Sequence, residues 1–388
     1  MSSMFRRLMM SKSHGPHPFP TNWIAGVEID ESVADPYARC TYTDDCAGYS
    51  PMSNKGTFTA GDWVGCPLWD LIYPVMRVGS TVTRLMKTDL TKDIDGNTVS
   101  TTANKFTHFE KIYTKMSKTG TVVSIKFSNV KGVGYSDWHF SRNGVVRDYF
   151  ESGCFKGYND SSVLTSRTGV SPTVSVNLTN FITYAQTGAG SGYDVTLYNN
   201  LTFIQMLFVL LFKSTNSQAV LGNGYVGGSA KQNTGVNNTL VNEYGMYGDI
   251  VSTTARVSFL WQEDMWGNIY EWIGGLKTDA NYDIQVGDIA NTTGSGYTTI
   301  DTGLSANILG YFSASMGGEQ SGFLPISTAS GSATAYYCDR GIVLASDFPR
   351  FGGRWDSSTN AGLFYLYVND SAATTNTGIG ARLSYGGE

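Results

Sequence analysis

The chain has 388 residues and a net charge of −5, and 15% of its residues are charged, against about 25% in an average globular protein. Hydrophobic residues make up 41% of the chain, which is enough to bury a core and excludes a wholly disordered protein. The chain has no Lys/Arg run and no basic stripe, so nucleic acid is excluded as a partner. The length favours two domains or one elaborated domain.

The composition is rich in Gly (45 residues) and Tyr (23 residues). Tyrosine supplies rigid contact area and small polar residues supply adaptable hydrogen bonds, as in binding surfaces. A loop-rich, strand-rich protein with many turns has the same composition. The five cysteines are widely spaced and form no CxxC pair, which indicates reduced, buried thiols and no cofactor or metal site: Cys40, Cys46, Cys66, Cys154 and Cys338.

The first elements in chain order are an arm and two strands. Prolines block regular structure in residues 1–20, which predicts a flexible or attaching arm. His14 and His17 in this arm are more often solvated than metal-bound. Residues 23–30 and 37–43 resemble short strands, and prolines break the apolar stretch 61–78.

Alternation predicts a hairpin from residues 109–116 and 121–128, and apolar periodicity predicts helices over 177–186 and 197–213. Residues 201–212 (LTFIQMLFVLLF) are the most apolar run. They are too short for the roughly 20 residues that span a bilayer, so we expect a buried core helix and no membrane insertion. Beyond it, short strands alternate with long Gly/Ser/Asn/Thr loops, and loops of this length usually carry function.

No motif for a nucleophile, a metal or a phosphate is convincing. His108 and His139 have no evident Ser or Cys partner. The acidic residues of 261–272 (WQEDMWGNIYEW) have aromatic neighbours, which imply burial. We therefore expect Glu263, Asp264 and Glu271 to have structural partners, with a glycosidase-type pair as the weaker reading.

Two separated segments carry a resemblance to a known family. Residues 266–272 read WGNIYEW, and residues 351–383 read FGGRWDSSTNAGLFYLYVNDSAATTNTGIGARL. Together they resemble the formylglycine-generating-enzyme-like branch of the C-type lectin fold, as it occurs in the variable proteins of diversity-generating retroelements and in phage receptor-binding proteins. The resemblance covers residues 106–388.

This resemblance implies an α+β, C-type lectin-like fold with a small β-rich N-terminal region. Residues 1–104 would serve attachment or assembly, and residues 105–388 would bind the ligand, with a variable-type segment at 336–388. The implied protein belongs to a phage virion, in a tail fibre or tail tip, and is assembled in the host cytoplasm. Its partners would be other tail proteins and a host-surface protein or glycan.

The C-terminal segment divides into anchors and displayed residues. Gly352 and Gly353 allow a tight turn, and apolar residues such as Leu366 and Val368 can enter the core. Tyr365 and Tyr367, two apart, would share one face of a strand. The candidate ligand-binding residues are Tyr336, Tyr337, Asp339, Arg354, Trp355, Asp356, Ser357, Tyr365, Tyr367, Asn369 and Asp370.

Two other functions stay open at this stage. The chain could be a glycan- or cysteine-modifying enzyme of the same branch, or a structural decoration of the virion. Catalytic members of the branch use cysteines, whereas Cys338 is the only cysteine after Cys154 and has no visible partner, which disfavours catalysis. A homotrimer is an open alternative without support from heptads.

Overall fold

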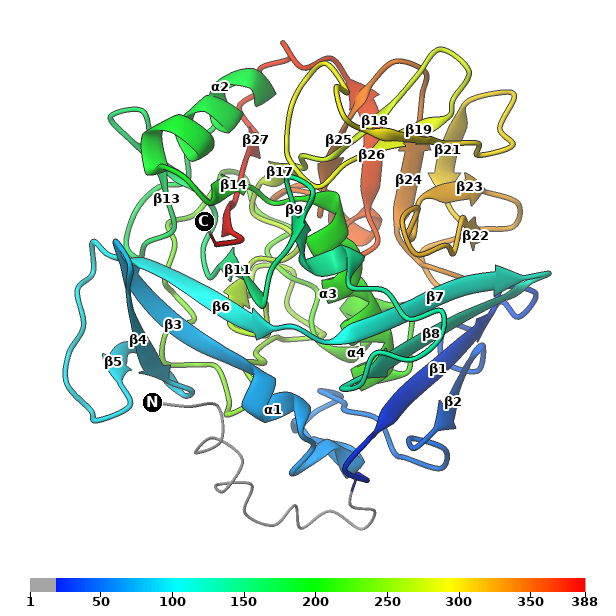
Figure 1. The fold of residues 1–388 in the computed structure, drawn as a ribbon, viewed down its shortest axis with the longest axis horizontal. Coiled ribbons are helices and arrows are strands. Elements are labelled where there is room, and N and C mark those ends of the chain that lie inside the picture. Colours follow the sequence, from blue (N-terminus) through cyan, green and yellow to red (C-terminus); the bar gives the residue numbers. More distant parts are fainter. Residues whose placement is uncertain (1–18, 388) are drawn as a thin grey trace.

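A computed structural model describes residues 19–387, and its secondary structure is mostly β-sheet with few helices (Figure 1). The expected α+β class is therefore not confirmed. His14 and His17 lie outside the described residues. Within residues 19–387, no helix combines the length and the apolar character needed to cross a bilayer.

An antiparallel sheet of four strands, in the order β2-β1-β8-β7, contains the predicted hairpin. Its strands are β1 (Ile24–Asp30), β2 (Cys40–Asp44), β7 (Tyr113–Thr119) and β8 (Val122–Ser128). The hairpin is confirmed, but it starts four residues later than predicted because Phe109 belongs to the preceding strand, β6 (Asn104–Glu110).

A sheet of seven strands has the order β14-β28-β11-β6-β3-β4-β5. Besides β6 it consists of β3 (Ile72–Val78), β4 (Thr81–Met86), β5 (Asp89–Asp93), β11 (Tyr149–Gly153), β14 (Tyr193–Val195) and β28 (Leu383–Tyr385). Strand β6 pairs with β3, and β8 pairs with β1. The boundary expected between residues 104 and 105 thus does not separate two folding units, because both large sheets combine strands from each side of it.

A sheet of six strands, in the order β21-β24-β26-β25-β17-β27, is built from the second half of the chain. Its strands are β17 (Tyr270–Trp272), β21 (Ile308–Tyr311), β24 (Arg340–Val343), β25 (Phe348–Phe351), β26 (Leu366–Asp370) and β27 (Ile379–Gly380). A smaller sheet joins β18 (Leu276–Thr278), β19 (Ile284–Val286) and β20 (Thr298–Ile300).

Four two-stranded ribbons complete the strands. They pair β9 (Ser141–Arg142) with β10 (Val145–Val146), β12 (Tyr158–Asp160) with β13 (Val163–Thr165), β15 (Ser258–Phe259) with β16 (Gln262–Glu263), and β22 (Ala314–Ser315) with β23 (Pro325–Ser327).

The helix α3 (Tyr198–Phe212) lies at the centre of the molecule, as Figure 1 shows, and confirms the predicted core helix. All fifteen of its residues are buried, so its whole circumference packs against the protein interior, rather than one apolar stripe. Lys213 ends it in the left-handed conformation, with φ of 49°. The other helices are short: α1 (Leu68–Leu71), α2 (Leu178–Thr183), which runs into a π-helical turn at Tyr184–Ala189, and α4 (Ser217–Val220).

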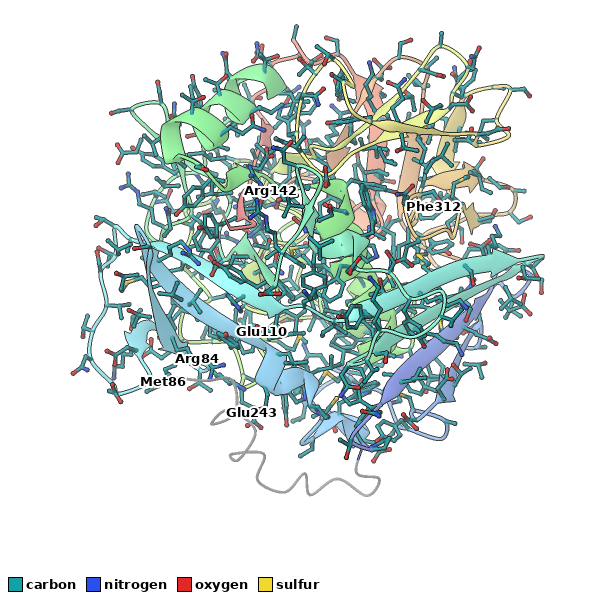
Figure 2. All side chains as sticks on the ribbon, in the orientation of Figure 1. Arg84, Met86, Glu110, Arg142, Glu243 and Phe312 are labelled. Atoms are coloured by element: carbon teal, nitrogen blue, oxygen red, sulfur yellow. The ribbon has the colours of Figure 1, made fainter. Side chains whose placement is uncertain are left out.

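The main core surrounds α3 and draws on all three large sheets. Side chains fill the space between these sheets, as Figure 2 shows; Phe312, labelled there, stacks on Tyr337 with ring centroids 4.4 Å apart. All five cysteines are buried free thiols, as expected.

Candidate functional site

The two segments that carry the sequence resemblance meet in the six-stranded sheet. Strand β17, from the first segment, pairs with β25 on one side and with β27 on the other. Glu271 accepts hydrogen bonds from the Arg382 guanidinium at 2.8 and 3.0 Å, and its Oε1 lies 2.7 Å from Lys156 Nζ. Burial alone would raise the pKa of Glu271, but the two cations outweigh it and lower this pKa. Glu271 therefore anchors the two segments to each other.

The neighbouring acidic residues have a similar structural role. Arg256 donates from Nε to both carboxylate oxygens of Asp264 and from Nη2 to Glu263 at 2.8 Å. Glu263 also accepts hydrogen bonds from the backbone N–H groups of Gly235 and Asn237. The predicted burial of Glu263, Asp264 and Glu271 is confirmed, with arginine and lysine as the main partners.

The opposite face of the same sheet carries a row of aromatic and arginine side chains. Tyr367 on β26 lies opposite Arg350 on β25 and Ile342 on β24. The alternate residues, such as Leu366 and Val368, belong to the main core. Because neighbouring residues of a strand point to opposite faces, the row faces away from this core. We call Tyr270, Arg340, Ile342, Arg350, Tyr365 and Tyr367, with residues 354–356 at their rim, the tyrosine–arginine face.

Three tyrosines form a stack on this face. The ring centroids of Tyr365 and Tyr367 lie 4.0 Å apart, and those of Tyr270 and Tyr365 lie 5.5 Å apart. The Arg350 guanidinium lies 4.8 Å from the Tyr270 centroid and 5.5 Å from that of Tyr367. Stacked rings under a guanidinium lose few degrees of freedom on contact with a partner, so the face is preorganised for binding.

The rim of the tyrosine–arginine face, residues 354–356, follows a tight turn. Gly352 and Gly353 turn the chain with φ of 85° and 81°. Arg354 then forms a two-pronged ion pair with Asp356, at 2.7 and 2.9 Å, and its guanidinium lies 5.2 Å from the Trp355 ring. Trp355 is half-buried and Asp356 is exposed. The rim thus offers an aromatic ring and a charged pair to solvent.

Several polar atoms of the face are buried without a hydrogen-bond partner among residues 19–387. They are Arg350 Nε and the Tyr365 hydroxyl, together with Asn369 Oδ1 at the adjoining end of β26. Asp370 Oδ2 has a charged partner, because it lies 2.8 Å from Arg350 Nη1. Burial raises the pKa of Asp370 despite this arginine. Unsatisfied buried polar groups are costly, and a bound partner would relieve that cost.

The structure buries five of the predicted site residues: Tyr365 and Tyr367 within the tyrosine stack, and three others whose hydrogen bonds hold them away from it. Tyr337 is fully buried, and its hydroxyl donates to Glu31 at 2.7 Å. Asp339 is buried too and accepts a hydrogen bond from the backbone N–H of Phe364 at 2.7 Å. Ser357 is buried and accepts from the backbone N–H of Arg354 at 2.9 Å. All three shape the backbone and are not on the exposed surface.

The remaining candidates divide by exposure. Arg354, Trp355, Asp356, Asn369 and Asp370 are at least partly exposed. Tyr367 keeps 8% of its surface exposed, and Tyr365, whose ring stacks on both Tyr270 and Tyr367, keeps only 1%. Tyr336 is half-buried beside Arg39, whose guanidinium lies 5.3 Å from its ring, and belongs to a different region.

Sequence reasoning missed Tyr270, Arg340 and Arg350. Strand pairing brings them to Tyr367 from distant parts of the chain. No local signal singled them out: period-two alternation places Tyr270 on the strand face of Trp272 and Arg350 on that of Phe348, and both of these aromatic residues are buried.

His108, His139 and Cys338 are held in structural contacts. His108 stacks between Tyr73 and Tyr149 and contacts Glu151 at 3.0 Å. His139 bonds to the carbonyl of Asn199 at 2.8 Å. Burial raises the pKa of the Cys338 thiol, which disfavours a thiolate nucleophile. In the part of the chain that the structure describes, no three His, Cys, Asp or Glu side chains gather as a metal site requires.

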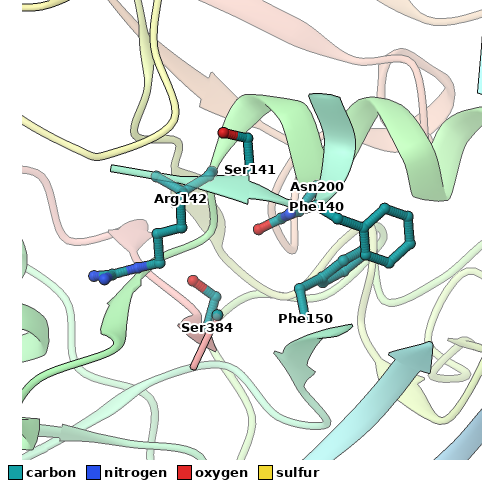
Figure 3. Close-up of a pocket in the computed structure, with 8 residues that line it drawn as sticks. Phe140, Ser141, Arg142, Phe150, Asn200 and Ser384 are labelled. Carbon is teal, nitrogen blue, oxygen red and sulfur yellow. The ribbon is translucent and has the colours of Figure 1, made fainter. Parts of the chain in front are cut away.

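One enclosed cavity, shown in Figure 3, lies between Phe140, Arg142, Phe150 and Asn200. Its volume of about 10 Å³ accommodates no more than about one water molecule. It is therefore too small for an organic ligand.

No protein-family model matches the chain, and no curated protein does. Among solved structures the chain is similar to the Major Tropism Determinant I1 variant, with 14% identity, a TM-score of 0.30, and coverage of 81% of this chain and 71% of the other. The U1 variant has 16% identity and a TM-score of 0.28 over the same shares. Treponema denticola variable protein 1 has 12% identity and a TM-score of 0.30, with 75% of this chain and 99% of the other covered.

At identities of 12–16% and TM-scores of 0.28–0.30, the function of this chain is argued from its own geometry.

Proposed function

We propose that the chain is a phage receptor-binding protein of a tail fibre or tail tip, built on a C-type lectin-like fold of the formylglycine-generating-enzyme-like branch. It attaches to a host-surface protein or glycan through the tyrosine–arginine face and its rim. The stack of Tyr270, Tyr365 and Tyr367 on the side of the sheet that faces away from the core carries this proposal. Aromatic and arginine side chains on a rigid support are the residues that dominate binding energies at interfaces.

In the C-terminal segment, core-facing and outward-facing side chains alternate, and this alternation supports a surface that tolerates substitutions. Leu366 and Val368 enter the core, whereas Tyr367 and Asn369 alternate with them on the other face. Rim residues such as Trp355 and Asp356 stand on a loop fixed by backbone contacts. Substitutions at the outward positions would alter the ligand without disturbing the core. Diversification by a retroelement would then give substitutions concentrated there in sibling phages.

The proposal is tested by adsorption of phage particles to the bacterial strain on which the phage grows. The triple variant Arg354→Ala, Trp355→Ala, Asp356→Ala removes the rim but no core side chain. We expect its adsorption rate to fall at least about tenfold, as for loss of a binding hot spot.

A matched control removes a charged pair elsewhere. Lys111 and Asp148 form an ion pair at 2.8 Å, and Asp148 is 89% exposed. The Lys111→Ala, Asp148→Ala variant should adsorb like wild type. Unchanged adsorption by a folded rim variant would contradict the assignment of this site.

A further inference from the structure

A second concave surface shares no residue with the tyrosine–arginine face. It is an open groove of about 550 Å³ between the turn at residues 136–138, Ile300 on β20, and the loop at residues 318–321. This volume lies within the usual range of small-molecule sites. Trp138 and Ile300 supply apolar surface, and Ser136, Glu319 and Gln320 supply polar groups.

Both walls of the groove are held in place by hydrogen bonds. On one side, Ser136 and Thr114 exchange backbone hydrogen bonds at 2.7 and 2.9 Å, and the Trp138 carbonyl accepts from the Asn199 amide at 3.1 Å. On the other side, the Tyr198 hydroxyl donates to the Ser321 carbonyl at 2.6 Å. The groove is therefore preformed, which lowers the entropic cost of binding a ligand.

Glu319 brings an ionised carboxylate to this groove. It accepts hydrogen bonds from Thr114 Oγ1 and the backbone N–H of Met116, both at 2.5 Å, and lies 3.3 Å from His139 Nε2. Burial would raise the pKa of Glu319, but the contact with His139 and, after it, the two hydrogen bonds outweigh burial and lower this pKa. Since a carboxylate has about four acceptor positions, one stays available to a ligand.

The Gln320 side chain lines the groove and is partly exposed. Its amide offers two donors and an acceptor. The groove thus combines the aromatic ring of Trp138 with the amide of Gln320, which can donate and accept, and the carboxylate of Glu319, which can accept. A hydroxyl group can both donate and accept, so a hydroxyl-rich ring with an apolar face satisfies all three features. An anionic ligand would be repelled by Glu319, and a purely cationic one would leave the Gln320 donors unused.

We propose that this groove binds a neutral saccharide, with its ring against Trp138 and its hydroxyl groups on Glu319 and Gln320. Such binding would give the protein a second contact to glycan, independent of the proposed receptor-binding face.

Saturation-transfer NMR of the full chain with methyl glycosides of glucose, mannose, galactose and N-acetylglucosamine tests this proposal. At least one glycoside should bind with a millimolar Kd. Trp138→Ala should weaken that binding about tenfold or more, and Trp138→Phe should retain most of it. Gln320→Ala, at a partly exposed position, should weaken saccharide binding several-fold. This variant tests the proposal if Trp138→Ala does not fold.

Asp160→Ala is the control, because the exposed Asp160 pairs with Arg167 at 2.9 Å outside both the groove and the tyrosine–arginine face, so it should leave saccharide binding unchanged. The proposal is overturned if no glycoside binds in the millimolar range, if the Gln320 and Trp138 variants bind like wild type, or if the loss occurs with Asp160→Ala instead. Binding of tetramethylammonium in place of the glycosides would also overturn it and would make the groove a cation site. None of these results changes the expected effect of the rim variant on adsorption.

Discussion

The two faces of the six-stranded sheet differ in how deeply their ion pairs are buried. Towards the core, Glu271 has Arg382 and Lys156 as partners, and Arg256 has both Asp264 and Glu263. On the tyrosine–arginine face, the ion pairs Arg350–Asp370 and Arg354–Asp356 keep between 12% and 47% of their side-chain surface exposed. Removing one partner of a buried pair costs much stability, whereas exposed pairs contribute little to stability and remain accessible to a ligand. The comparison assigns stability to one face and recognition to the other.

The largest effect should follow from breaking the charged cluster under the sheet. Arg382→Ala leaves Glu271 buried with Lys156 alone and removes hydrogen bonds to the carbonyls of Gly153 and Glu263. We expect a loss of about 3–5 kcal/mol in the free energy of unfolding, measured by chemical denaturation. Arg354→Ala, whose carboxylate partner is exposed, should change it by no more than about 0.5 kcal/mol. Similar losses for both arginines would contradict the division between the two faces.

A smaller loss is expected at the turn that starts the rim. Gly353 has φ of +81°, and an added Cβ would lie 2.5 Å from the Ala361 Cβ. Gly353→Ala should cost about 2–4 kcal/mol from backbone strain and overpacking together. Gly144 has φ of +75° with open space around it, so Gly144→Ala should cost only about 1 kcal/mol. Equal costs in thermal unfolding would show that packing of the rim loop does not matter.

The smallest effect concerns Asp339, which the sequence placed on the surface and the structure places in the core. Burial raises the pKa of this carboxyl above its usual range. A folded pKa above the unfolded one gives stability that is present below about pH 4 and is lost as the pH rises through the folded pKa. The free energy of unfolding of wild type, relative to Asp339→Asn, should therefore fall by about 1 kcal/mol or more between pH 4 and pH 8. A difference that does not change with pH would refute this placement.

Local patterns predicted the parts of the molecule that depend on local sequence. The length and apolar character of residues 201–212 were enough for the central helix, and alternation was enough for the hairpin of β7 and β8. Burial of Glu271 followed from its aromatic neighbours. Its partner Arg382 did not, because 111 residues separate the two and no local rule gives the pairing of β17 with β27.

The region of the candidate site was predicted from the sequence, but several of its residues were not, because local patterns do not reveal contacts between residues distant in the sequence. Tyr365 and Tyr367 do share a face, as period-two alternation requires. Tyr337 and Asp339 have the same residue types as displayed positions, but they pack against Glu31 and Phe364, which lie far away in the sequence. Arg350 and Tyr270 reach the face only through strand pairing. Composition therefore identified the region, and long-range register determined its members.

The most direct test of the account compares two neighbours on one strand, Tyr367 and Val368, which point to opposite faces of the sheet. Adsorption to the host strain, normalised to folded protein, and the free energy of unfolding would be measured for Tyr367→Ala and Val368→Ala. We predict that Val368→Ala loses about 1–3 kcal/mol of stability but keeps its adsorption per folded molecule, whereas Tyr367→Ala loses adsorption at least about tenfold. Adsorption that is retained by folded Tyr367→Ala, or lost equally in both variants, would contradict the account.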